Sequence, residues 1–253
     1  MTDLPALRTS YDDLARDYER LFPDWQESSR RQGAVLDRLV AAELGPGRRR
    51  VLDCAAGVGT QALALAALGH DVVGSDVSVA ALRRAAAPGR LVGVAVADMR
   101  RLPLADGSVE VVVCADNSLP HLLTPADVLA ALREMRRVAV RDGLVLVSTR
   151  DYDELRRTRP GTTPVQVSRR DGRLAATFQV WTWHDDGERY DYEHVLVLDE
   201  EPGWRVGHRT GTYWAVPRAE LAALAREAGL ADVRWLLPTD EGGFVQPLLL
   251  ARA

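Results

Sequence analysis

Lysine and isoleucine are absent from this 253-residue sequence, so all 32 basic residues are arginines. We attribute this bias to a GC-rich genome rather than to chemistry. Cysteine is scarce, and Cys54 and Cys114 form no C-x-x-C pair, which indicates small buried side chains rather than redox groups or metal ligands. The five histidines also lack the spacing of metal ligands. We therefore expect no metal site.

Long apolar runs and strongly basic segments are missing as well. No segment is apolar over enough residues to cross a bilayer, and the acidic, polar start MTDLPALRTSYDD does not fit a secretory signal. We therefore expect a cytoplasmic protein without a membrane partner. The net charge of −4 also disfavours nucleic acid as a partner. No feature of the sequence indicates an oligomeric state.

What is present is a regular alternation of strand-like and helical segments. Between residues 50 and 150, Val- and Leu-rich runs alternate with segments of helical periodicity, which predicts an α/β fold with a doubly wound, mostly parallel Rossmann-like sheet. After residue 160, alternating runs joined by Asp-Gly-type turns predict an antiparallel hairpin excursion after the fifth strand. A helix within PRAELAALAREAGL and two strand-like runs follow it.

A glycine-rich turn joins the first strand to a helix in VLDCAAGVGTQALALA. Gly57 and Gly59 let the backbone approach a ligand, and the helix N-terminus behind them offers free N–H groups. Alone, this G-x-G also fits dinucleotide binding or a simple tight turn. Asp53, ahead of the glycines, would repel a pyrophosphate and suits an ammonium group. Asp76, which ends the second strand, is placed to bind both hydroxyls of a ribose.

In the order D-x-A-x-G-x-G, G-S-D-x-S, A-D-M-R-x-L-P and L-V-S-T-R, residues 50–150 resemble the class I S-adenosylmethionine-dependent methyltransferases more than nicotinamide dehydrogenases. The resemblance implies S-adenosyl-L-methionine as cofactor and S-adenosyl-L-homocysteine as product. It implies that the cofactor-binding residues of this region include Asp53, Ala55, Gly57, Gly59, Asp76, Val77, Asp98 and Met99. The first four belong to the loop for the methionine part, the fifth holds the ribose, and the last three meet the adenine. For Met99, core packing is the alternative.

The segment SYDDLARDYERL resembles the tyrosine-bearing lid of many such enzymes. Tyr11 or Tyr18 would close over the cofactor, and Tyr18 is our choice, although both also fit packed helix aromatics. Arg30 or Arg31 would pair with the cofactor carboxylate, because an arginine fork matches carboxylate geometry. We assign Arg31 to this role, and a solvated helix face is the alternative.

Polar residues follow the fourth and fifth strands in CADNSLPHLL and STRDYD, and both ends project to one edge of the sheet. N-S-x-x-H-L and R-x-Y-D are similar to glycine N-methyltransferase and the sarcosine methyltransferases. The resemblance implies that Asn117 and Arg150 hold a substrate carboxylate, that His121 faces the substrate, and that Ala115 and Asp116 line the cofactor side. The alternatives are a surface ion pair of Arg150 with a neighbouring aspartate and a packed loop imidazole at position 121.

A neutral amine needs no strong base to accept a methyl group, and its proton can leave through water, His121 or Tyr213. A hydroxyl acceptor would need a general base, for which His121 is the best candidate. Six aromatic residues of the hairpin block either roof the substrate or pack in the core: Trp181, Trp183, Tyr190, Tyr192, Tyr213 and Trp214.

The sequence therefore predicts a methyltransferase of small molecules that acts on the amine of an amino acid or a similar carboxylate-bearing metabolite. The alternatives are an O-methyltransferase of secondary metabolism and a cofactor-binding protein without catalysis. We divide the chain into an N-terminal helical lid (1–45), a cofactor-binding core (46–160), a β excursion over the substrate (161–215), and a C-terminal helix with the last core strands (216–253).

Overall fold

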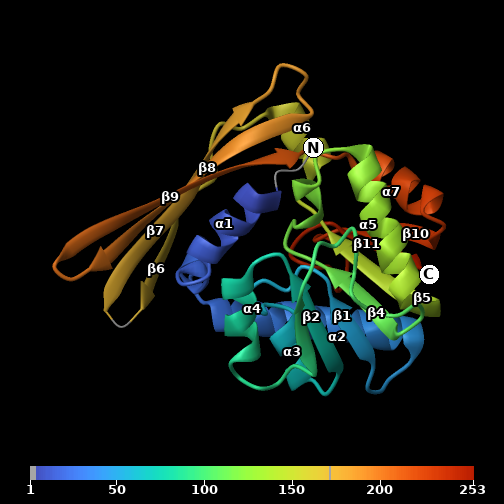
Figure 1. Ribbon diagram of the computed structural model, residues 1–253. Helices are drawn as coiled ribbons and strands as arrows, with labels where there is room; N and C mark the ends of the chain where they lie inside the picture. The colour runs from blue at the N-terminus through green and yellow to red at the C-terminus, as the bar shows by residue number, and fades with distance from the viewer. Residues whose placement is uncertain (1–3, 171) are drawn as a thin grey trace.

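A computed structural model describes residues 4–170 and 172–253. Its centre is a seven-stranded sheet in the order β10-β11-β5-β4-β1-β2-β3 (Figure 1). Strands β1 to β5 pair in parallel, and β11 runs antiparallel to both of its neighbours. The predicted doubly wound, mostly parallel sheet is confirmed. The strands are β1 (Arg50–Asp53), β2 (Asp71–Asp76), β3 (Gly93–Val96), β4 (Val109–Cys114), β5 (Ala139–Ser148), β10 (Ala231–Leu236) and β11 (Leu248–Arg252).

Helices cover both faces of this sheet because its central strands are apolar on both sides. In β4, Val111 and Val113 pack towards one face, and Val112 and Cys114 pack towards the other. The first face carries α2 (Trp25–Leu44), α3 (Ala62–Ala67) and α4 (Val79–Ala86), and the second carries α5 (Pro125–Val138) and α7 (Arg218–Glu227). Cys54 and Cys114 are buried free thiols, as predicted.

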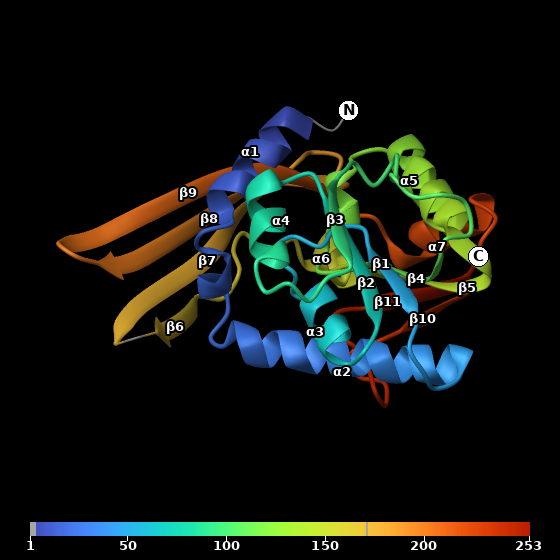
Figure 2. The ribbon, with the colours of Figure 1, turned by 60° about the horizontal axis from the view of Figure 1, so that its bottom comes forward.

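A second sheet of four antiparallel strands projects from one side of the core (Figures 1 and 2). Its strands are β6 (Gln166–Arg170), β7 (Arg173–Trp183), β8 (Arg189–Glu200) and β9 (Gly203–Trp214), in sequence order. The predicted antiparallel hairpins are therefore confirmed. The helix α6 (Tyr152–Thr158) comes before them, and we did not predict it.

The N-terminal segment lies between the second sheet and the core. It consists of α1 (Leu4–Leu14) and the 3-10 helix η1 (Tyr18–Leu21). Leu14 packs against Ala175, Leu196 and Leu198 of the second sheet. The Asp12 carboxylate accepts hydrogen bonds from the Ser78 hydroxyl (2.7 Å) and from the backbone N–H of Ala80 (2.8 Å), at the start of α4. The segment is thus fastened on both sides.

A short 3-10 helix, η2 (Leu119–His121), follows β4 and completes the edge of the sheet where the site lies. Among the residues that the structure describes, no helix is long and apolar enough to cross a bilayer. Within the same residues, no group of three or more histidines, cysteines and acids is arranged to hold a metal ion. The division into four parts remains a prediction.

Candidate functional site

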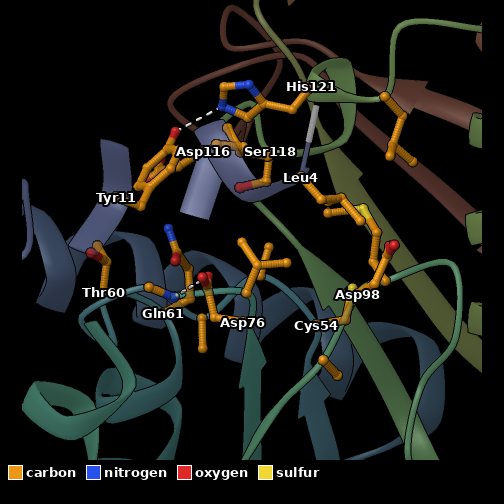
Figure 3. Close-up of a pocket in the computed structure, with 18 of the residues that line it drawn as sticks. Leu4, Tyr11, Cys54, Thr60, Gln61, Asp76, Asp98, Asp116, Ser118 and His121 are labelled. Atoms are coloured by element: carbon orange, nitrogen blue, oxygen red, sulfur yellow. Dashed lines mark hydrogen bonds between the residues drawn. The ribbon is translucent and has the colours of Figure 1, made fainter. Parts of the chain in front are cut away.

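A cavity of about 740 Å³, including the space at its mouth, lies at the carboxyl edge of the seven-stranded sheet. We call it the edge cavity. Figure 3 shows Tyr11, His121 and Asp116 towards one end and Asp76 and Gln61 towards the other. Its lining comes from the N-terminal segment and from the loops after the first four strands: Leu4, Leu7, Tyr11, Tyr18, Cys54–Gly57, Thr60, Gln61, Asp76, Val77, Ala97–Met99, Asp116, Ser118, His121 and Leu122.

Asp76 and Asp116 line this cavity, Asp53 lies behind its wall without lining it, and none of the three has a cationic side chain of the described residues within 4.0 Å. Asp53 lies fully buried behind the loop after β1, its Oδ2 has no hydrogen-bond partner in that part of the chain, and burial raises its pKa to about 7. Asp76 accepts hydrogen bonds from the backbone N–H groups of Gly57 and Ser78 (both 2.8 Å), yet burial still raises its pKa. Asp116 also has a buried, unpartnered Oδ2, and burial raises its pKa. The site is therefore arranged for a ligand that brings positive charge.

The two glycines of the loop have different roles. Both have positive φ angles, +52° at Gly57 and +96° at Gly59. A Cβ atom at position 57 would face open space, so the backbone at Gly57 is free to approach a ligand. A Cβ atom at position 59 would lie 2.8 Å from the Leu63 side chain. Gly59 thus allows the close packing of α3. We had expected it to line the cavity, and it does not.

Most of the residues that we assigned to the cofactor surround the edge cavity. Those that line it are Tyr18, Ala55, Gly57, Asp76, Val77, Asp98, Met99 and Asp116. Ala115 is buried and does not line it. The carboxylate of Asp98 already accepts hydrogen bonds from the Arg100 guanidinium (2.7 and 2.9 Å).

Arg31 lies elsewhere. It is exposed on α2 and does not line the cavity, and Arg30 forms a surface ion pair with Glu27. The buried face of α2 carries Ser29 and Gln32 instead, and Ser29 donates a hydrogen bond to the carbonyl of Thr60 (2.5 Å). The solvated-face alternative therefore fits both arginines, and the assignment of Arg31 was wrong in position.

A second cavity adjoins the first beneath the antiparallel sheet, and we call it the sheet cavity. Tyr11, Tyr18 and Asp116 line both cavities. The other lining residues are Ser10, Leu14, Leu21, Phe22, Arg150, Gln179, Tyr192, His194, Arg209, Tyr213 and Gln246. The two cavities therefore meet at these three side chains, of which Asp116 is the charged one.

Arg150 is the central cation of the sheet cavity. It donates hydrogen bonds from Nη1 to the Tyr190 hydroxyl (2.8 Å) and from Nη2 to Oε1 of Gln179 (3.1 Å). Its Cζ lies 5.0 Å from the ring centroid of Trp181 and 5.2 Å from that of Tyr213. No carboxylate in the described chain lies within 4.0 Å of this guanidinium.

The surface ion pair that we considered for Arg150 is formed by another arginine. Asp151 and Asp153 both pair with Arg218, at 3.2 and 2.7 Å. Arg150 is partly buried. A partly desolvated guanidinium without a counter-ion is costly, and contacts with aromatic rings offset only part of that cost. Arg150 is therefore available for an anionic group of a ligand.

Asn117 connects the two strand ends rather than lining either cavity. Its Oδ1 accepts a hydrogen bond from the backbone N–H of Arg150 (2.9 Å), and its buried Nδ2 has no partner among the described residues. The φ angles of Asp116 (+54°) and Asn117 (+64°) lie in the left-handed region, which asparagine and aspartate tolerate better than most residues. Asn117 thus fixes the backbone from which the Arg150 side chain extends.

His121 and Tyr213 come together next to Tyr11. The Tyr11 hydroxyl and His121 Nε2 are 2.8 Å apart, and the ring centroids of His121 and Tyr213 are 4.4 Å apart. Burial, together with the nearby Arg150 guanidinium, lowers the pKa of His121 to about 3. The imidazole is therefore neutral near pH 7.

The sequence reasoning missed a polar row on the inner face of the second sheet. Gln179, His194 and Arg209 are paired directly across β7, β8 and β9, so their side chains project from the same face. Burial, with Arg209 and Arg150 nearby, lowers the pKa of His194 to about 4. Only the hairpin register brings these residues together. Gln246 was also missed, although its place just before the last strand of the core was a usable signal.

The edge cavity fits S-adenosylmethionine. This cofactor carries a sulfonium, an ammonium group and a ribose diol. The cavity is lined by the Asp76 and Asp116 carboxylates, Asp53 lies behind its wall, and Oδ2 of Asp53 and of Asp116 has no hydrogen-bond partner among the described residues. A pyrophosphate would meet the repulsion of the same three groups.

Comparison with known proteins also points to methyltransferases. Residues 51–143 match the model of a family described as "Methyltransferase domain". The chain is 33% identical over 149 residues to a glycine/sarcosine N-methyltransferase of Parasynechococcus marenigrum, covering 57% of this chain and 51% of that protein. It is 30% identical over 139 residues to a glycine/sarcosine/dimethylglycine N-methyltransferase of Actinopolyspora halophila, covering 52% of this chain and 24% of that protein. The chain thus spans about half or less of the length of these relatives.

The fold also matches solved structures over nearly the whole chain. SAM-bound CalS10, an amino pentose methyltransferase from Micromonospora echinaspora, is similar with a TM-score of 0.72 and 23% identity over 94% of each chain. At this identity the likeness shows the fold alone. Residues 51–143 thus match a methyltransferase domain, the fold is similar to that of solved S-adenosylmethionine-dependent methyltransferases, and both findings indicate S-adenosyl-L-methionine as the cofactor.

Proposed function

We propose that this protein methylates the amine of an amino acid or of a similar carboxylate-bearing metabolite. The observation that carries the proposal is Arg150, a partly buried guanidinium in the cavity next to the cofactor site, with no carboxylate of the described residues within 4.0 Å. The names of the two curated relatives, which act on glycine and sarcosine, support it over the part of the chain that they match.

Within the edge cavity, Asp76 would hold the ribose hydroxyls and the loop from Asp53 to Gly57 the methionine end, with Val77 and Met99 against the adenine. When bound, S-adenosylmethionine supplies an electrophilic methyl group on its sulfonium sulfur. The residues of this chain bind and orient the two reactants and exclude water, and orientation alone accounts for up to about 7–11 kcal/mol of a barrier in favourable cases.

His121 favours an amine over a hydroxyl as the acceptor. A hydroxyl must lose its proton to a base in the reaction, and an imidazole whose pKa is lowered to about 3 is a poor base near pH 7. A neutral amine needs no such help, because its lone pair is already nucleophilic. With an amine acceptor, the neutral imidazole of His121 would act by holding the Tyr11 hydroxyl, which lies 2.8 Å from its Nε2. The O-methyltransferase alternative is therefore the weaker one.

The aromatic residues of the second sheet would shield this reaction from solvent. Tyr190, Tyr192 and Tyr213 are buried, and the Tyr213 ring contacts the other two. Its centroid lies 4.8 Å from that of Tyr192, on which it stacks, and 5.7 Å from that of Tyr190, to which it is tilted. A dry pocket strengthens the attraction between Arg150 and a carboxylate, because the effective dielectric constant is lower there.

A panel assay with the whole chain tests the proposal. Glycine, sarcosine, dicarboxylic amino acids and an amino sugar without a carboxylate are incubated with S-adenosylmethionine, and mass spectrometry locates the methyl group. We expect transfer to the nitrogen of an amino acid. Transfer to the amino sugar alone or to a hydroxyl would contradict the proposal, and cofactor binding without any transfer would favour the non-catalytic alternative.

Variants of Arg150 make the test specific. Arg150→Ala should raise the KM for the amino acid at least tenfold and leave cofactor affinity unchanged, since a hydrogen bond to a charged group is worth about 1.5–3 kcal/mol. Arg150→Lys should restore only part of the affinity, because a point charge cannot reproduce the planar fork. Arg218→Ala is the matched control, since it removes an arginine whose partners are Asp151 and Asp153. Equal effects of the alanine variants at positions 150 and 218 would refute a carboxylate site at Arg150.

A further inference from the structure

The Asp116 side chain lies where the two cavities meet, at the end of β4. It lines both the edge cavity, together with Asp76, and the sheet cavity, together with Arg150. Figure 3 shows it next to Ser118 and Tyr11, at the His121 end of the edge cavity. On the proposed function, a methyl group would pass from the edge cavity to a substrate held by Arg150 in the sheet cavity. Asp116, with Tyr11 and Tyr18, lies on that path.

The backbone holds this side chain in one position. The N–H of Asp116 donates a hydrogen bond to the Ser148 hydroxyl (2.9 Å), and that hydroxyl donates in turn to Gln246 (3.0 Å). The φ angle of +54° lies in the left-handed region, which aspartate tolerates better than most residues. The carboxylate is therefore held at the junction of the two cavities.

The carboxylate also has unused capacity. Oδ2 of Asp116 is buried and has no hydrogen-bond partner among the described residues, and no arginine or histidine in that part of the chain lies within 4.0 Å. Arg150, across the sheet cavity, has the opposite charge and likewise no counter-ion. An amino acid zwitterion has the complementary pair of charges, with an amine for Asp116 and a carboxylate for Arg150.

From this juxtaposition we infer, on the basis of the proposed function, that Asp116 binds the N–H groups of the acceptor amine and so selects primary and secondary amines. In the transfer, the nitrogen lone pair forms the new N–C bond while the C–S bond breaks and its electron pair stays on sulfur. The nitrogen becomes positively charged, and the Asp116 carboxylate stabilises that charge until a proton leaves to water. With its N–H groups on Asp116, the amine directs its lone pair towards the cofactor.

The number of N–H groups sets a limit on the product. A neutral primary amine has two, a secondary amine has one, and a tertiary amine has none for the carboxylate to accept. The first two methyl groups are therefore added readily, and the third is added at least tenfold more slowly. Dimethylglycine is the expected end product when glycine is the probe.

Calorimetry with a matched pair of ligands tests the contact without turnover. Sarcosine and methoxyacetate have the same shape and carboxylate, but the second has an ether oxygen in place of the amine. With S-adenosyl-L-homocysteine present, sarcosine should bind the wild-type chain at least tenfold more tightly, and Asp116→Asn should remove this preference. Asparagine tolerates the left-handed backbone, so the variant keeps the local fold. Asp151→Asn, which removes a neighbouring carboxylate that pairs with Arg218, is the control and should keep the preference.

Each other outcome has a distinct meaning. Equal affinity of both ligands for the wild type, or a preference that survives in Asp116→Asn, overturns the Asp116 contact and leaves the carboxylate site at Arg150 intact. Failure of both ligands to bind overturns the proposed function and the inference with it. In the turnover assay with glycine, trimethylated product formed as fast as dimethylated product overturns the selection by N–H groups.

Discussion

Replacing Asp53 with asparagine should stabilise the cofactor-free protein and weaken cofactor binding at the same time. The Asp53 side chain is fully buried, and burial raises its pKa from 3.8 to about 7. A shift of ~3 units corresponds to ~4 kcal/mol. Asparagine has the same shape and no charge, so the variant avoids the cost of ionising a buried carboxyl group.

The direction of the predicted stability difference follows from its dependence on pH. Because the pKa of the folded state lies above that of the unfolded state, the folded protein holds an extra proton between about pH 4 and pH 7. The free energy of unfolding of the wild type therefore falls as the pH rises through that window. From pH 5 to pH 8, the difference in the free energy of unfolding between Asp53→Asn and the wild type should change by roughly 2–3 kcal/mol in favour of the variant. This is the part of the Asp53 pKa shift that lies in this pH interval.

Urea unfolding of both proteins at pH 5 and pH 8, without cofactor, measures this difference. Packing changes caused by the amide are the same at both pH values and cancel in the comparison. His121 and His194, whose pKa values are lowered, act equally in both proteins and cancel too. In separate calorimetry without urea, the wild type should bind S-adenosylmethionine about tenfold more weakly at pH 5.5 than at pH 7, because the cationic groups of the cofactor favour the ionised form of Asp53. A stability difference that does not change with pH would refute a buried, protonated Asp53.

Two further substitutions test the cover of the site. Gly211→Ala places a Cβ atom 2.6 Å from the Tyr192 hydroxyl, so it should cost about 1–3 kcal/mol of stability in urea unfolding and weaken substrate affinity but not cofactor affinity. Gly207→Ala on the same strand is the control, since its Cβ atom would lie at an ordinary 3.7 Å from Leu196, and an equal loss in both variants would contradict the reasoning. Asp12→Ala removes the hydrogen bonds to Ser78 and Ala80, each worth about 0.5–3 kcal/mol, so amide hydrogen exchange in α1 should speed up roughly tenfold. Unchanged exchange in α1 would show that this contact does not hold the segment.

The fold was readable from the sequence because its signals are local. Strand and helix periodicities, the turn glycines and the Asp-Gly-type turns identified both sheets and their pairing type. Helix α6 was missed because the acid-rich segment after Arg150 was interpreted only as a binding loop, yet Asp151 caps that helix by accepting a hydrogen bond from the backbone N–H of Glu154 (3.3 Å).

The candidate site was readable only where it follows from strand ends. Asp76 ends β2, Asp116 and Arg150 lie two residues beyond β4 and β5, and topology alone places all three at one edge. Arg31 was misplaced because we did not compare its position around α2 with that of the buried residues. Ser29 and Gln32, three residues apart, mark the buried face, and Arg31 points away from it. The row of Gln179, His194 and Arg209 depends on the register of two long hairpins, which no local pattern specifies.

That register belongs to one of the two sheets from which the cavities are built. The edge cavity is built from loops of the parallel sheet, whereas the polar row comes from residues spaced along β7, β8 and β9, none of which lines the edge cavity. Substitutions at alternate positions of these strands would change the lining of the sheet cavity and leave the loops of the edge cavity in place. The proposed sites for the methyl donor and the acceptor thus rest largely on different sheets, so one can be altered with little change to the other.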